Sequence, residues 1–163
     1  CSGAWRYLIG DVIRFVNKKE GHLIITGRTK HFLSLVGEHL SVDNMNRAVD
    51  RLSEEFNTDF SEFCVAGIPS DGSFAHAWYL GVNHAAPPDT RLLAQRLDEH
   101  LKDLNDDYAV ERGSALKELQ LKLVPVERFY SFMTANGKLG GQNKFPRVLK
   151  SAQLEEWRKF LGE

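Results

Sequence analysis

FSEFCVAGIPSDGSFAHAWYLGV, residues 60–82, has the pattern of a β-hairpin in the middle of the chain. Two β-rich runs, 60–68 and 74–82, flank five turn-forming residues, 69–73. In the second run one parity carries large side chains and His76, whereas the other parity carries mostly small ones. We therefore predict a central sheet with a helix packed closely on its small-residue face, and a His76 that is a satisfied core or interface group.

The flanking sequence supplies helices for this sheet. A cap at Ser41 or Asp43 opens a run to about Phe56 whose apolar residues recur at helical spacing. The prolines before Asp89 end the second strand, and a leucine-faced helix can follow them until residues 105–107. Further on, the pattern predicts a half-buried strand over 119–123, closed by a proline, and helices over 126–135 and 151–161.

The chain opens with a second predicted hairpin. Residues 7–16 and 22–26 are β-rich and flank a polar turn that ends in Gly21, and a shorter β-rich run covers 31–36. The fold class that satisfies all these faces is α+β, a small mixed β-sheet flanked by helices. Because the first residue is a cysteine and not a methionine, we expect the N-terminal β-hairpin to lead in from a missing larger domain.

Composition limits the functions that the chain can have. Its 163 residues, 42% hydrophobic and 26% charged, fit one globular domain, and the net charge of −1 provides no basic field for nucleic acid or an anionic membrane. Two cysteines make neither a disulfide framework nor a cysteine-built zinc site, and the six histidines lack metal-ligand spacing, so we predict no metal site. Cys64 lies in an apolar run and is predicted to be a buried free thiol, which fits a cytoplasmic protein.

Three segments carry candidate chemistry. Residues 7–11 (YLIGD) place Asp11 after a glycine, and a carboxylate in that setting can accept hydrogen bonds from two sugar hydroxyls. Residues 27–30 (GRTK) and 137–147 (GKLGGQNKFPR) deliver cations suited to phosphate, the second through Lys144. Taken singly, each also fits a turn or a solvated loop without chemical function.

Taken in order, these segments resemble the signatures of the GH3 family, the acyl acid–amido synthetases first named from auxin-responsive plant proteins. Residues 7–14 resemble its Y-x-x-G-D-x-x-R signature, and residues 27–30, with Gly37 after them, resemble the hinge motif of the wider adenylate-forming superfamily. Residues 141–147 are similar to its C-terminal Q-x-K-x-P-R segment. The resemblance spans nearly the whole chain.

The resemblance implies an ATP-dependent ligase that joins a small carboxylic acid to an amine, such as an amino acid, through an acyl-AMP. Asp11 would hold the ribose hydroxyls, Tyr7, Arg28 and Lys30 would lie at the nucleotide and the hinge, and Lys144 would be catalytic during adenylation. ATP and Mg²⁺ would be the cofactors.

The resemblance also implies a division of the chain. Residues 1–30 would be the end of a large N-terminal domain and the hinge, and residues 31–163 a mobile C-terminal cap domain whose partner is that N-terminal domain, absent here. The isolated fragment is therefore expected to be inactive, and residues 29–41 fit a bacterial-type member best. Two alternatives stay open: the same domain in an acyl-CoA ligase, and a non-enzymatic α+β binding or regulatory module.

Overall fold

The computed structural model describes residues 10–28, 32–83, 89–137 and 144–163. The elements within these residues, in chain order, are β1 Asp11–Asn17, β2 His22–Arg28, β3 Phe32–Leu33, β4 Leu40–Ser41, α1 Val42–Phe56, β5 Phe63–Ser70, β6 Ser73–Val82, α2 Thr90–Leu104, α3 Asp106–Arg112, β7 Leu116–Pro125, α4 Val126–Ala135 and α5 Ser151–Leu161.

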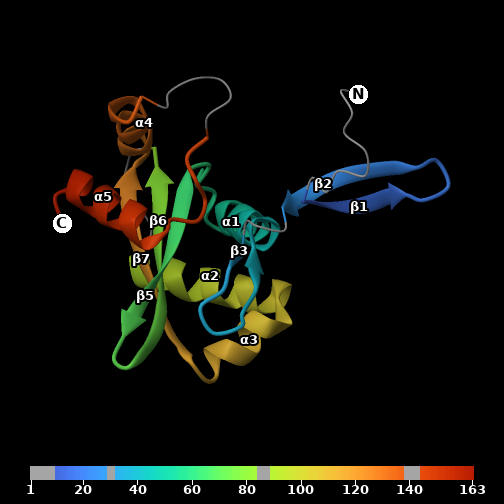
Figure 1. Ribbon diagram of the computed structural model, residues 1–163, viewed down its shortest axis with the longest axis horizontal. Helices are drawn as coiled ribbons and strands as arrows, with labels where there is room; N and C mark the ends of the chain where they lie inside the picture. Colours follow the sequence, from blue (N-terminus) through green and yellow to red (C-terminus); the bar gives the residue numbers. More distant parts are fainter. Residues whose placement is uncertain (1–9, 29–31, 84–88, 138–143) are drawn as a thin grey trace, which may run out of the picture.

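A three-stranded mixed sheet of order β5-β6-β7 forms the centre of the molecule (Figure 1). β5 and β6 pair antiparallel as the predicted hairpin, whereas β7 pairs parallel with β6 after a crossover through α2 and α3. The predicted five-residue turn is too long, because pairing continues to Ser70 and Ser73. Asp71 and Gly72 alone make the turn, and both have positive φ (41° and 75°), as a type I′ hairpin turn requires.

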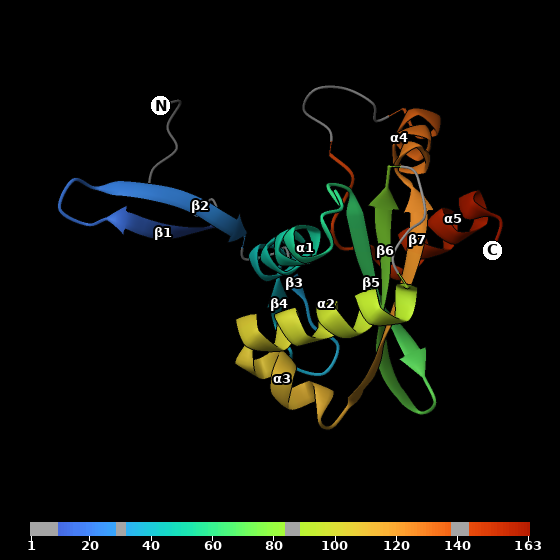
Figure 2. The same cartoon turned by 180° about the vertical axis from the view of Figure 1, so that it is seen from behind.

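Helices cover both faces of this sheet (Figures 1 and 2). On one face Val65, Trp78 and Leu80 share a hydrophobic cluster with the buried residues of α1 and α2. On the other face Ala66, Ala77 and Tyr79 share a second cluster with α4 and α5, where the helix side chains are Phe129, Met133, Leu154 and Trp157. The prediction that the small-residue face takes a closely packed helix is confirmed, and so is the α+β fold class.

Most helix ends follow local capping chemistry. The Ser41 side chain accepts a hydrogen bond from the Asn44 amide, and Asn44 completes a capping box at the start of α1. Asn105 follows the end of α2, as predicted, but its side chain also caps α3, which the sequence pattern did not predict. Seven residues are too few to show a helical periodicity clearly.

The N-terminal hairpin β1–β2 stands away from the layered body (Figures 1 and 2). Several of its apolar side chains are exposed, among them Val16 (61%) and Ile25 (63%). The β-rich run expected over 31–36 shortens to β3, which pairs with β4 across a loop. In the described part of the chain, no helix is both long and apolar enough to cross a membrane.

Candidate functional site

A groove of about 1070 Å³ opens between two segments that are distant in sequence. The loop after β3, with Leu33 and Leu35, provides one wall, and the segment from Lys144 to α5 provides the other. Among the described residues that line the groove, none is acidic and three are basic. Of the three, Arg147 is paired with the Glu62 carboxylate at 3.1 Å, whereas Lys144 and Lys150 are exposed. The groove therefore favours an anionic group.

Lys144 is exposed in this wall, and the residues after it are held firmly. Phe145 is only 6% exposed, and its ring centroid lies 4.9 Å from that of Phe129 and 5.1 Å from that of Trp157. The backbone then adds a short parallel bridge to the free edge of β5: the Val65 amide donates to the Arg147 carbonyl (2.8 Å), and the Leu149 amide donates to the Val65 carbonyl (2.9 Å). The backbone at Lys144 is thus fixed from its C-terminal side.

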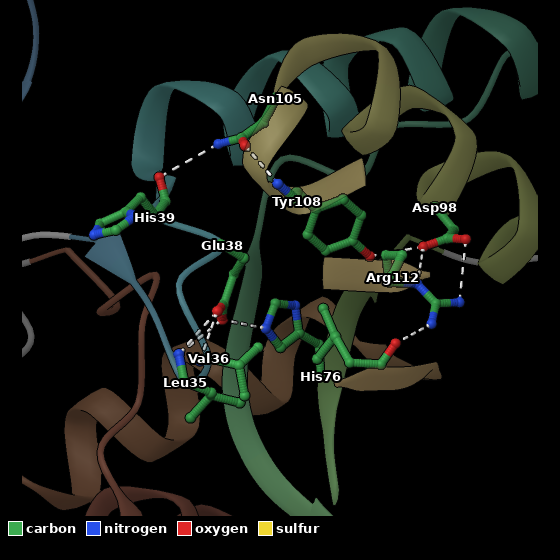
Figure 3. A network of polar contacts seen from close by, with 10 residues as sticks. Leu35, Val36, Glu38, His39, His76, Asp98, Asn105, Tyr108 and Arg112 are labelled. Carbon is green, nitrogen blue, oxygen red and sulfur yellow. Dashed lines mark hydrogen bonds and ion pairs between the residues drawn. The ribbon is translucent and has the colours of Figure 1, made fainter. Parts of the chain in front are cut away.

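The opposite wall depends on a buried carboxylate, Glu38 (Figure 3). Its oxygens accept hydrogen bonds from the amides of Leu35 (2.9 Å) and Val36 (3.0 Å), and His76 Nε2 donates to Oε1 at 3.0 Å. Glu38 and His76 are both fully buried. The loop is therefore tied to the central strand β6. His76 is a core group as predicted, but it is only partly satisfied, because its Nδ1 is buried and has no hydrogen-bond partner among the described residues.

Glu38 stays ionised because its hydrogen bonds outweigh its burial. Burial works to raise the pKa of this carboxyl, but the bonds from His76 and from the amides of Val36 and Leu35 lower the pKa from 4.5 to about 2. A group with that pKa keeps its charge at neutral pH and does not exchange a proton there. Glu38 thus shapes the loop and is no general acid or base. Sequence reasoning missed it, although its position directly after Gly37 was visible.

A second buried network lies beside the first (Figure 3). The Tyr108 ring centroid lies 5.7 Å from that of His76, and the Tyr108 hydroxyl donates to Asp98 (2.7 Å). Arg112 and Lys102 also donate to Asp98 at 2.6 Å each. Burial, followed by the negative charge of Asp98, raises the pKa of Tyr108. Burial also works to raise the pKa of Asp98, but the hydrogen bonds that Asp98 accepts from Arg112, Lys102 and Tyr108 outweigh burial and lower it. This network joins α2 to α3 and is structural.

The predicted site residues fall into two groups. Asp11 begins β1, and its backbone is paired with that of Arg28 in β2, so the hairpin brings these two positions together. Lys144 lies in the groove, and Asp11 is not among the described residues that line the groove. Tyr7 and Lys30 lie outside the described residues.

Comparison with known proteins agrees with this architecture. The family model of the GH3 family C-terminal domain matches residues 43–153. No curated protein matches. A solved structure of the GH3.15 acyl acid amido synthetase superposes with a TM-score of 0.79 at 23% identity, and covers 99% of this chain and 31% of that one.

A second structure, AtGH3.15 acyl acid amido synthetase in complex with 2,4-DB, gives a TM-score of 0.79 at 22% identity and covers 99% of this chain and 30% of that one. These likenesses show the fold. The chain spans less than a third of the length of these structures. Because the family model covers more than half of the residues, the chain belongs to the GH3 family and carries its C-terminal domain.

Proposed function

We propose that the chain is the C-terminal part of an ATP-dependent ligase that activates a carboxylic acid as an acyl-AMP and then transfers the acyl group to an amine such as an amino acid. The observation that carries the proposal is Lys144, which is exposed in a groove where no described lining residue is acidic and lies directly before a segment held on the sheet edge. An ammonium group on a backbone held in this way can stabilise charge that develops on phosphate and carboxylate oxygens. Family membership supports the same reaction class.

Each candidate residue has a role in this proposal. Lys144 is the catalytic cation of adenylation, and Asp11 accepts hydrogen bonds from the ribose hydroxyls of ATP. Arg28, Lys30 and Tyr7 lie on the nucleotide and hinge side. Mg²⁺ enters with ATP because phosphate oxygens are its preferred ligands. The reaction takes place in the cytoplasm, where a free thiol such as that of Cys64 stays reduced.

We further propose that residues 1–30 are the end of a larger N-terminal domain with its hinge, and that residues 31–163 form the mobile cap. The hairpin β1–β2 supports this division. Several of its apolar side chains are exposed, for example Val12 at 45% and Phe15 at 49%, and such a gathering of exposed apolar side chains on one hairpin supports a contact with a partner. The partner is the N-terminal domain of the same protein.

Pyrophosphate release by the full-length protein tests the proposal. A screen over carboxylic acids, with amino acids or coenzyme A as the acceptor, distinguishes an amide synthetase from an acyl-CoA ligase. We expect Lys144→Ala to lower acyl-AMP formation at least about tenfold, which corresponds to about 1.4 kcal/mol. Lys159→Ala, an exposed lysine on α5, is the control.

Asp11→Ala should weaken ATP binding in calorimetry and leave the circular dichroism spectrum unchanged. Equal ATP affinity would argue against the role of Asp11. Wild-type pyrophosphate release by Lys144→Ala would contradict the catalytic role of the lysine, and no release with any acid would favour a non-enzymatic module.

A further inference from the structure

Arg147 has an arrangement of contacts that the proposed chemistry leaves unexplained. It lies three residues after Lys144, and its side chain reaches back to residues 61–63, which lead into β5. Nη1 donates to the Glu62 carboxylate (3.1 Å) and to the Phe63 carbonyl (3.1 Å), and Nη2 donates to the Ser61 carbonyl (3.0 Å). The guanidinium carbon also lies 4.2 Å from the centroid of the Phe63 ring.

These contacts need the shape of an arginine. A planar, forked guanidinium can reach several acceptors and stack on an aromatic ring at once, whereas an ammonium group is a single point charge. The Arg147 side chain is 25% exposed and that of Glu62 is 22% exposed, so the pair is partly shielded from water. Together with the backbone bridge to Val65, the side chain fixes the direction in which the chain leaves the sheet edge.

We propose that Arg147 is a positioning residue that holds Lys144 at the angle and depth needed for adenylation; this inference rests on the proposed catalytic role of Lys144. Phe145 fixes the segment through burial, so its loss would disturb the aromatic cluster itself. Arg147 lies outside that cluster and acts on the direction of the segment. Without it the burial of Phe145 and the bridge to Val65 would still hold the segment, but the direction of Lys144 would be less fixed. Misplacement of a catalytic group by even about 1 Å can cost a large factor in rate.

The chain offers a matched control in Arg128. Its guanidinium also lies over a phenylalanine ring, 4.6 Å from the Phe160 centroid, and it donates to the Phe160 carbonyl at 2.6 Å. These contacts join α4 to α5 and do not involve the Lys144 segment. A variant at Arg128 therefore removes a similar interaction without moving the lysine.

The test measures acyl-AMP formation by the full-length protein for Arg147→Ala, Arg128→Ala, Lys144→Ala and the double variant Lys144→Ala/Arg147→Ala. We expect Arg147→Ala to lower kcat at least about fivefold with KM for ATP within about twofold, and Arg128→Ala to leave both near wild type. The double variant should be as slow as Lys144→Ala alone, because Arg147 acts only through the lysine. Arg147→Lys should not restore the rate.

Any of four results would overturn the inference while the role of Lys144 stands. They are a wild-type kcat in Arg147→Ala, a wild-type kcat in Arg147→Lys, an equal loss of kcat in Arg128→Ala, and a further loss of kcat when Arg147→Ala is added to Lys144→Ala. A wild-type rate for Lys144→Ala would instead contradict the proposed function itself. If Arg147→Ala does not fold, Glu62→Gln removes the ion pair at constant size and should lower kcat in the same way; an unchanged kcat in that variant would count against the positioning role.

Discussion

Replacement of Glu38 by glutamine tests how the groove wall is held. The substitution keeps the size of the side chain but removes the charge that binds two backbone amides and His76. The lowered pKa sets the magnitude, since a fall from 4.5 to about 2 corresponds to about 3 kcal/mol in favour of the ionised, folded form. We therefore expect Glu38→Gln to lower the free energy of unfolding by about 3 kcal/mol at pH 7.

The pH dependence follows from the direction of the shift. A carboxyl whose pKa is lower in the folded state stabilises the protein fully above its unfolded pKa of 4.5, and that stabilisation is lost as the pH falls toward about 2. Linkage gives a loss of roughly 1 kcal/mol at pH 4 and roughly 2 kcal/mol at pH 3 in the wild type. The difference in stability between wild type and Glu38→Gln should therefore shrink to less than half by about pH 3.

Urea unfolding followed by the fluorescence of the buried Trp78 and Trp157 measures both quantities. The control is Glu156→Gln, at an exposed glutamate on α5, which should leave the free energy of unfolding unchanged across this pH range. A difference between wild type and Glu38→Gln that stays constant from pH 7 to pH 3 would refute the claim that Glu38 is ionised in the folded protein. A difference in the free energy of unfolding below about 0.5 kcal/mol at pH 7 would show that the hydrogen bonds of Glu38 only offset the free-energy cost of burying its charge.

Three further predictions concern the core. Asp98→Asn should cost about 3 kcal/mol in urea unfolding, because it leaves the largely buried Arg112 guanidinium and the Tyr108 hydroxyl without their charged acceptor; a cost below about 1 kcal/mol would contradict this. A Cβ at Gly67 would lie 2.7 Å from Leu35 Cγ and closer still to the Leu35 methyl carbons, so Gly67→Ala should lower the free energy of unfolding by about 1–3 kcal/mol. Leu35→Ala should lower it less in the Gly67→Ala background than in the wild type, because the smaller side chain removes the clash. Burial raises the pKa of the Cys64 thiol, so in a Cys1→Ser background disulfide reagents should label it only as fast as the protein unfolds, and rapid labelling of the folded state would refute its burial.

Elements whose signal is local could be predicted from the sequence. The helices α1, α4 and α5 match their predicted ranges because each has an apolar stripe and clear end signals. The partner of β7 could not be predicted, since its alternation of apolar and polar residues fits any edge of a sheet. The two-residue strand β4 was missed because Leu40 and Ser41 carry no periodicity of their own.

The candidate site shows the same division. Lys144 could be selected from the sequence because glycines precede it and Phe-Pro-Arg follows it. The contact of its segment with β5 could not, because Arg147 and Glu62 are 85 residues apart and a charge pair of that kind has no local pattern. Glu38 and His76 were not linked for the same reason, at a separation of 38 residues.

The two walls of the groove are held by interactions that share no residue, although both walls contact β5. Leu35, on the wall fixed by Glu38, packs over Gly67 on the α1–α2 face of the sheet. The Lys144 segment is fixed by the β5 edge at Val65 and by the aromatic cluster on the α4–α5 face. Changes at sites without shared partners act independently as a rule. Glu38→Gln should therefore lower the free energy of unfolding by the same amount with or without Arg147→Ala, and Arg147→Ala should lower kcat by the same factor with or without Glu38→Gln. Coupling between them would instead mean that the two walls move as one unit through β5.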